Sequence, residues 1–127
     1  MSIQNYTFHI DEASSAGTKE YYIPFDRLVE VEAVSIVANQ AITAAGAYVT
    51  LTVLGSDGAT ALCSRNTNSG GTGTTLAKGV SEDLTMGNNE KANFSGSQSL
   101  KITSVQTGGV ITDVVLNIKV RDARDFS

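Results

Sequence analysis

The residues that could do chemistry in this chain are few, and a pair of glutamates is the first candidate. Glu30 and Glu32 are two positions apart in a stretch that alternates apolar and polar residues, as a β-strand does. This spacing puts both carboxylates on one strand face, about 6–7 Å apart at the backbone, and glycosidases use two carboxylates. Sugar sites also stack rings on aromatic side chains, and the chain has no tryptophan. We therefore expect a solvated strand face and assign no catalytic residue.

The single histidine and the single cysteine add little. His9 is the only imidazole, which excludes His-rich metal sites such as those of cupins. We expect it on the exposed side of a strand. Cys63 stands between Leu62 and Ser64, with no basic residue nearer than Arg65. A packed or half-exposed thiol is therefore expected at this position, not a nucleophile.

Two further patterns resemble ligand sites only loosely. Asp57 and the pair Glu82-Asp83 could supply oxygen ligands to Ca²⁺, but no loop has the spaced acids of an EF-hand. The glycine-rich loop at 70–73 lacks the lysine and the strand-to-helix setting of a phosphate-binding loop. We expect a surface loop with no core residue over 66–75. The sequence predicts no enzyme activity, no metal site and no cofactor.

Composition excludes several classes of partner. The 127 residues suit one domain, and the abundance of Gly, Ala, Ser, Thr and Val favours short strands with polar turns. A net charge of −4 with scattered basic residues predicts no nucleic-acid partner. No apolar run could span a membrane, and the first residues lack the features of a signal peptide. A lone cysteine fits folding in a reducing cytoplasm.

The elements that must position these residues are strands, and the longest alternating stretch is 110–120. One face of it is apolar, with Val110, Val114, Leu116, Ile118 and Val120. Ile111 and Val115 interrupt the otherwise polar opposite face. We expect this strand to form an antiparallel hairpin with 99–105. A second hairpin is predicted from 48–54 and 59–65, because Gly55-Ser56-Asp57-Gly58 between them is a turn signal.

Another long strand is predicted over 28–38, and the residues on one of its faces change from charged to apolar midway. Val29, Val31, Ala33 and Val37 hold one face. On the other face Glu30 and Glu32 give way to Val34 and Ile36, so we expect this half to be covered on both sides. Together with the apolar interruptions of the last long strand, this predicts a homo-oligomer in which a neighbouring subunit covers one sheet. A trimer is expected ahead of a dimer.

The first residues form a strand followed by an acidic loop. Tyr6, Phe8 and Ile10 alternate along one side of the strand, and the loop runs from Asp11 to Lys19. Such an arm could add its strand to a partner's sheet edge, or could be an edge strand of its own sandwich, and the sequence leaves both open. The predicted organisation is an arm, a β-sandwich domain and a tail, at residues 1–19, 20–121 and 122–127.

The fold class follows from the number of strands. About eight strands with turns at short intervals, and no convincing helix, predict two antiparallel sheets packed face to face. We expect an all-β sandwich of the jelly-roll type, with an immunoglobulin-like sandwich as the alternative.

A resemblance adds a function to this architecture. The run from Tyr21-Tyr22-Ile23-Pro24-Phe25 to Leu54-Gly55-Ser56-Asp57-Gly58, with the alternating C-terminal strand, resembles small structural proteins of tailed bacteriophages. In length, composition and strand rhythm the chain is similar to capsid decoration, or head cement, proteins. The resemblance implies a non-enzymatic sandwich that binds the major capsid protein and reinforces the shell, often as a trimer. It also implies a place on the virion head, after assembly in the host cytoplasm.

Partner-binding residues are expected among the apolar side chains of the arm and of the last strand. They are Tyr6, Phe8, Ile10, Ile111 and Val115. The alternative function is a carbohydrate- or receptor-binding module of a tail or fibre, for which only four tyrosines and four phenylalanines could provide aromatic platforms. A hydrolase based on the glutamate pair is a third hypothesis, and it lacks supporting groups.

Overall fold

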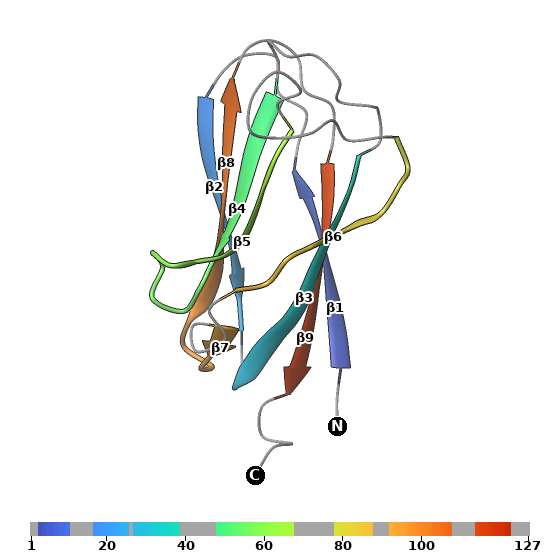
Figure 1. Cartoon of the computed structure of the whole chain (residues 1–127). Coiled ribbons are helices and arrows are strands. Elements are labelled where there is room, and N and C mark those ends of the chain that lie inside the picture. Colours follow the sequence, from blue (N-terminus) through green and yellow to red (C-terminus); the bar gives the residue numbers. More distant parts are fainter. Residues whose placement is uncertain are drawn as a thin grey trace.

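The computed structural model describes residues 3–10, 17–25, 27–38, 48–67, 78–87, 92–107 and 114–122. Within these ranges the chain forms strands that build two antiparallel sheets, which face each other across the core (Figure 1). The strands are β1 (Ile3–Ile10), β2 (Gly17–Pro24), β3 (Val29–Ala38), β4 (Tyr48–Leu54), β5 (Ala61–Asn66), β6 (Glu82–Leu84), β7 (Asn93–Phe94), β8 (Ser99–Thr107) and β9 (Val114–Asp122).

The strand pairing identifies the topology. The larger sheet has the order β1-β9-β3-β6, with β7 also paired to β3, and the smaller sheet has the order β2-β8-β4-β5. The pairs β4–β5, β3–β6, β2–β8 and β1–β9 are nested inside one another, as in one long antiparallel ribbon folded at its middle and rolled up. This nesting is the jelly-roll arrangement, so the predicted jelly-roll sandwich is confirmed. An immunoglobulin-like sandwich has a different strand order, so that alternative is excluded.

Strand β9 is an inner strand of the larger sheet and lies between β1 and β3. Its side chains alternate between buried and half-buried, because successive residues of a strand point to opposite faces of the sheet. Val114, Leu116, Ile118 and Val120 are almost completely buried, which confirms the predicted inner face over this range. Val110 and Ile111 lie outside the described residues.

The predicted hairpin between 99–105 and 110–120 is wrong. Strand β8 lies between β2 and β4 in the smaller sheet, whereas β9 belongs to the larger sheet. The chain therefore crosses from one sheet to the other between Thr107 and Val114. Alternation identifies the face of a strand that is buried, but it does not specify the strand that pairs with it.

A β-bulge explains the change of character in β3. The register to β9 shifts between Val31 and Ala33, which is the effect of one extra residue in one strand of a pair. Val29 and Val31 face the core before the bulge, and Val34 and Ile36 face it afterwards. The expectation that the second half of this strand is covered on both sides is therefore wrong. Val34 and Ile36 are core residues and give no support for a subunit contact.

The N-terminal strand is part of the sandwich. All of β1 pairs with β9, from Ile3 opposite Arg121 to Ile10 opposite Val114. The structure thus selects the edge-strand arrangement from the two that the sequence left open. Strand β2 begins at Gly17, so the predicted loop is shorter than expected, and a boundary at residues 19–20 falls inside β2.

The hairpin of β4 and β5 has the predicted turn. Asp57 Oδ1 accepts hydrogen bonds from the backbone N–H groups of Ala59, at 3.0 Å, and Thr60, at 2.8 Å. Gly58 has a φ of +70°, a conformation that favours glycine. The side-chain acceptor and the glycine together specify this turn, which confirms the hairpin.

Both sheets contribute to one core. Its largest fully buried side chains are Phe94, Ile36, Leu51, Leu62, Leu100, Ile102, Leu116 and Ile118. One polar residue of the predicted 66–75 loop also belongs to the interior: Thr67 is fully buried, and its Oγ1 accepts a hydrogen bond of 3.0 Å from the N–H of Val49. The expectation of no core residue in that loop is therefore wrong at Thr67, and residues 68–75 lie outside the described part.

Candidate interaction surfaces

The predicted partner-binding residues do not lie on one surface. Ile10 is 5 % exposed, and Tyr6 and Phe8 are partly buried against the core. These three side chains help to hold the domain together, because they point between the sheets. Val115 is half-buried and points the opposite way, out of the larger sheet. Ile111 lies outside the described residues.

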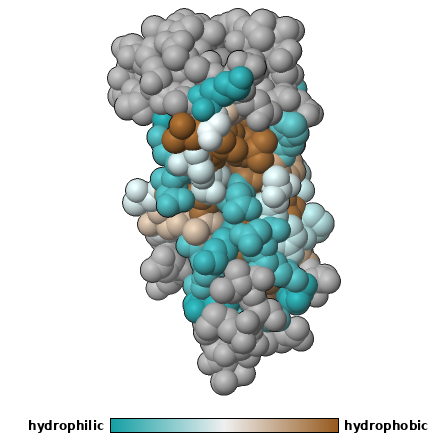
Figure 2. All heavy atoms as spheres, turned by 90° about the vertical axis from the view of Figure 1, so that its right-hand side faces the viewer, coloured by the Kyte–Doolittle hydropathy of each residue, from teal (hydrophilic) through white to brown (hydrophobic). Residues whose placement is uncertain are grey.

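The outer face of the larger sheet has an apolar end, which we define by Val37, Val80 and Val115. Val37 and Val115 are directly opposite each other on β3 and β9. The N–H of Gly79 donates to the carbonyl of Ala38 at 2.8 Å, which places the segment carrying Val80 beside the end of β3. Val80 is 56 % exposed. Figure 2 shows apolar surface at this end of the face, with hydrophilic surface over most of the rest.

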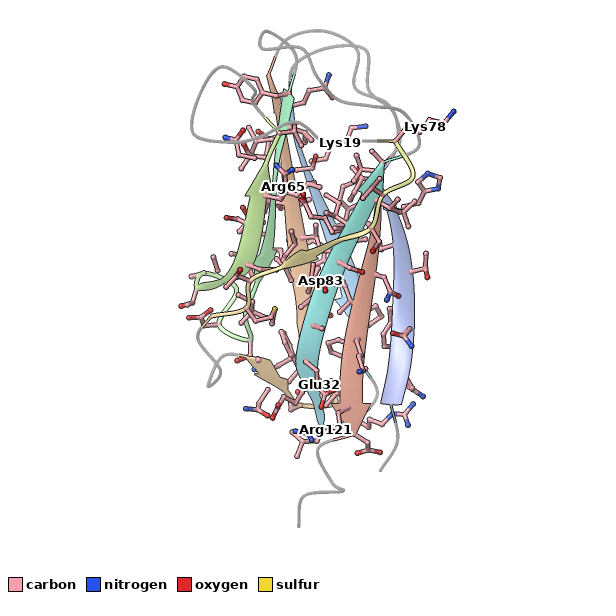
Figure 3. The ribbon with its side chains drawn as sticks, turned by 45° about the vertical axis from the view of Figure 1, so that its right-hand side comes forward. Lys19, Glu32, Arg65, Lys78, Asp83 and Arg121 are labelled. Atoms are coloured by element: carbon pink, nitrogen blue, oxygen red, sulfur yellow. The ribbon has the colours of Figure 1, made fainter. Side chains whose placement is uncertain are left out.

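The other end of the same face is charged. Arg121 contacts both candidate glutamates, with Nη2 3.4 Å from Glu30 Oε1 and Nε 2.8 Å from Glu32 Oε1. Lys119 Nζ lies 3.9 Å from Glu32 Oε2. Figure 3 shows Glu32 and Arg121 together at the end of β3 and β9 that is far from Lys78. The two carboxylates thus share one face as predicted, and they are neutralised by cations in an ion-pair network.

The outer face of the smaller sheet is almost uncharged. Its central rows pair Thr52 with Thr103 and Thr50 with Val105. Its most exposed apolar side chains are Tyr22, at 56 %, and Val105, at 42 %. The charged pair on β2 and β8, Glu20 and Lys101, is joined at 3.2 Å. This face presents hydroxyl groups to the solvent and carries little net charge.

One open side of the sandwich, between β1 and β2, is closed by aromatic rings. Tyr6 and Phe25 pack edge to face with ring centres 5.8 Å apart, and Phe8 and Tyr21 do the same at 5.1 Å. Each pair joins the larger sheet to β2 or to the residue that follows β2. Phe25 also packs on the fully buried Phe94 at 5.3 Å.

The opposite open side, between β5 and β6, is closed by polar contacts. Arg65 Nε donates to Glu82 Oε2, although the Arg65 side chain is only 10 % exposed, and Arg65 Nη1 donates to the carbonyl of Asn66. The N–H of Gly87 donates to the carbonyl of Leu62 at 2.8 Å. A groove of about 470 Å³, which we call the β5–β6 groove, runs between residues 61–65 and 82–87.

A pocket of about 610 Å³ lies at the start of β1, and we call it the β1 pocket. Its described lining residues are Gln4, Asn5, Tyr6, Pro24, Phe25 and Arg27. Gln4 Oε1 accepts hydrogen bonds of 3.2 Å from both Tyr6 Oη and Arg27 Nη2. Arg27 Nη1 lies 3.9 Å from Asp122 Oδ2. The pocket thus combines ring surface with a connected polar wall.

The other residues that the sequence singled out for possible chemistry occupy structural positions. Cys63 is 5 % exposed, which confirms a packed thiol, and burial raises its pKa to about 12. His9 is exposed on its strand, as expected. Asp57 caps its turn and Glu82 pairs with Arg65, so these acids serve separate purposes. In the described ranges, no group of three or more His, Cys, Asp and Glu side chains is arranged to hold a metal ion.

Sequence reasoning missed two of these features. Arg27 and Gln4 meet across 23 positions in the chain, and Arg65 and Glu82 across 17. Neither spacing forms a motif, because the partners come from elements on opposite sides of the sandwich, whose arrangement the sequence did not specify. The nested order of a jelly roll would have supplied the missing signal, since it places β1 beside β2 and β5 beside β6.

Comparisons with known proteins give little further information. No protein-family model and no curated protein matches the chain. It is similar to a chain in the structure of infectious bursal disease virus Gx strain, with 13 % identity and a TM-score of 0.43, over 94 % of this chain and 33 % of that one. For the Gt strain of the same virus the identity is 11 % and the TM-score 0.38, over 93 % and 31 %. The chain spans about a third of the length of the chains it matches.

The described part of the chain contains no helix with the length and apolar character needed to cross a bilayer.

Proposed function

We propose that this chain is a non-enzymatic virion structural protein, a decoration or cement protein that binds the major capsid protein on the head of a tailed phage. The observation that carries the proposal is the apolar end of the larger sheet. Val37 and Val115 occupy outward positions that alternation would normally give to polar residues, and they are direct cross-strand partners. Apolar groups gathered at one end of an otherwise polar face are typical of protein–protein contacts.

The rest of the molecule is consistent with a binding function. The glutamates that could have been catalytic are held by Arg121, and the Cys63 thiol is buried, which raises its pKa to about 12. A two-sheet sandwich presents two broad sheet faces to its surroundings, and such a face can contact a shell. The resemblance to decoration proteins in length and strand rhythm supports the same function.

We also propose that the protein acts as a homo-oligomer, with a trimer expected before a dimer. The support from β3 has gone, because Val34 and Ile36 are in the core. What remains is the resemblance, which implies trimers, because the outward Val115 is already assigned to the shell contact. Light scattering on the purified protein measures the oligomeric state directly. A monomer at tens of micromolar concentration would remove this part of the proposal and leave shell binding to be tested separately.

The test of shell binding is co-sedimentation with shells assembled from the major capsid protein of the phage that encodes the chain. Val37→Lys and Val115→Lys each place a charge in the apolar end, and we expect either substitution to reduce binding at least tenfold. Thr52→Lys adds the same charge to the outer face of the smaller sheet and should leave binding unchanged. Equal binding by all three variants, each with a thermal midpoint close to that of the unmodified protein, would show that the apolar end is not the contact.

A carbohydrate- or receptor-binding module of a tail or fibre is the alternative function. The observation that favours it is the β1 pocket, which has a volume within the roughly 300–1,000 Å³ typical of ligand sites.

A further inference from the structure

The β1 pocket lies far from the apolar end of the larger sheet. Gln4 is near the start of β1, whereas His9, near its end, is opposite Val115. Five residues of strand separate the two positions by roughly 17 Å. A ligand in the pocket and a protein on the apolar end therefore contact different parts of the molecule, so the two activities can be tested independently.

The polar wall of the pocket presents both donors and acceptors. Gln4 Oε1 accepts from Tyr6 Oη and from Arg27 Nη2, so this oxygen is occupied within the wall. The two N–H groups of the same amide remain as donors, and the Tyr6 oxygen retains lone pairs as an acceptor. The outward side chain of Asn5 accepts from Asn117 Nδ2 at 3.4 Å, which leaves the Asn5 backbone to line the pocket. A ligand that both donates and accepts, as a hydroxyl group does, satisfies such a wall.

The charges of the described residues around the pocket are balanced. Arg27 is the cation among the described lining residues, and Asp122, which is not one of them, lies 3.9 Å from it and is 9 % exposed. The two charges sum to zero, and the Asp122 carboxylate would repel an anion that approached the guanidinium. The preferred ligand is therefore neutral.

The apolar part of the pocket comes from rings. Tyr6 is partly buried and packs edge to face on Phe25, and Pro24 lies beside them on the lining. Rigid rings of this kind offer apolar contact at a low cost in conformational entropy, and the tyrosine adds a polar end. A pyranose has the matching surfaces, with C–H groups on its faces and hydroxyl groups around its rim.

We propose that the β1 pocket binds a neutral saccharide, with the sugar ring against Tyr6 and Pro24 and its hydroxyl groups on Gln4, Tyr6 and Arg27. A site that is open and holds one sugar ring should bind with a dissociation constant in the millimolar range, since small ligands gain little free energy per atom. Multivalent display, on an oligomer or on a shell, would raise the apparent affinity by holding several pockets near one glycan surface.

The experiment is a titration followed by amide chemical shifts of the isotope-labelled protein. The probes are glucose, galactose, mannose and N-acetylglucosamine as neutral sugars, and glucuronate and N-acetylneuraminate as anionic ones. We expect a neutral sugar to shift the amides of Asn5, Tyr6 and Arg27 in a saturable manner and to leave Thr103 unchanged. No saturable shift with any of the sugars, at concentrations well above the millimolar range, would overturn the proposal, as would tighter binding of the anionic sugars.

Matched variants identify the binding groups. Gln4→Leu and Arg27→Met remove polar groups from the wall while keeping similar volume, and each should weaken sugar binding at least fivefold. Lys119→Met is the control, because Lys119 also lies 3.9 Å from a carboxylate, that of Glu32, but on the outer face. Unchanged affinity in Gln4→Leu and Arg27→Met would exclude the pocket. Shell co-sedimentation with the same variants should be unaffected, so failure of sugar binding is distinguishable from failure of shell binding.

Discussion

The two open sides of the sandwich are closed by different chemistry. Between β1 and β2, the aromatic pairs Tyr6–Phe25 and Phe8–Tyr21 bridge the sheets. Between β5 and β6, the bridge is the Arg65–Glu82 ion pair and a backbone hydrogen bond from Gly87 to Leu62. Ring burial gains free energy from the apolar area removed from water, whereas an ion pair must offset the desolvation of two charges. The aromatic side should therefore contribute more to the stability of the fold.

Removal of β1 is the most severe test of this difference. Deletion of residues 1–12 eliminates the pairing with β9 and removes Tyr6, Phe8 and Ile10 from the interior. We expect the shortened protein to lose its cooperative thermal transition, because its larger sheet would end at an exposed central strand. Deletion of residues 1 and 2 alone leaves β1 whole and should change little. A cooperative transition within a few degrees of the original in the longer deletion would show that β1 is a detachable arm.

Single substitutions compare the two sides directly. Phe8→Ala removes one aromatic bridge, and because the ring is only partly buried we expect a loss of about 2–3 kcal/mol in the free energy of unfolding. Leu84→Ala on β6 removes a partly buried side chain from the polar side and should cost about 1 kcal/mol. Chemical denaturation measures both. A larger loss for Leu84→Ala would reverse the comparison, and Thr7→Ala, exposed beside Phe8, is the control for β1.

The ion pair on the polar side can be tested by a double-mutant cycle. Glu82→Gln removes the carboxylate charge that contacts the mostly buried Arg65 guanidinium, so we expect a loss of about 1–2 kcal/mol. Arg65→Met combined with Glu82→Gln should cost less than the sum of the two single changes, with a coupling of about 1 kcal/mol.

The pair of Lys101 and Glu20 on the outer face of the smaller sheet is the matched control for this cycle. Its side chains are 25 % and 49 % exposed, so its coupling should be only about 0.2–1 kcal/mol and should weaken with added salt. Equal coupling energies and equal salt dependence in the two cycles would mean that Arg65–Glu82 is an ordinary surface pair.

Much of this architecture was accessible from the sequence. Alternation identified the inner face of β9, and Asp57 with Gly58 identified the β4–β5 turn, because both signals are local. The jelly-roll class followed from the number of short strands. The face of each strand and the fold class are therefore encoded over a few neighbouring residues.

The long-range features were not accessible. The bulge between Val31 and Ala33 exchanges the inward and outward faces of the second half of β3. A single extra residue leaves no recognisable pattern in the sequence, because apolar residues stand both before and after it. The separation of β8 from β9 depends on strand order, which alternation does not specify. The β1 pocket combines residues from β1, from the end of β2 and from Arg27 beyond it, so its existence depended on that same order.

The smallest expected effect is the pH dependence of stability that comes from the single cysteine, Cys63. This residue lies on the polar side of the sandwich, between β5 and β6. Burial raises the pKa of the Cys63 thiol from 9.0 to about 12, because the interior disfavours the thiolate. Above pH 9 the unfolded chain therefore loses this proton while the folded protein keeps it. The stability linked to Cys63 is complete below about pH 9 and declines as the pH rises toward 12.

Cys63→Ala removes this dependence, and the difference between the two proteins isolates it from the effects of pH that both proteins share. We expect their denaturation midpoints to converge as the pH rises above 9, and a thiol reagent at neutral pH to label Cys63 only as fast as the protein opens. Rapid labelling of the folded protein, with a pH dependence identical in both proteins, would mean that solvent reaches Cys63 through the β5–β6 groove. The polar contacts would then bridge the sheets without closing that side, and the aromatic side would be the only sealed one of the two.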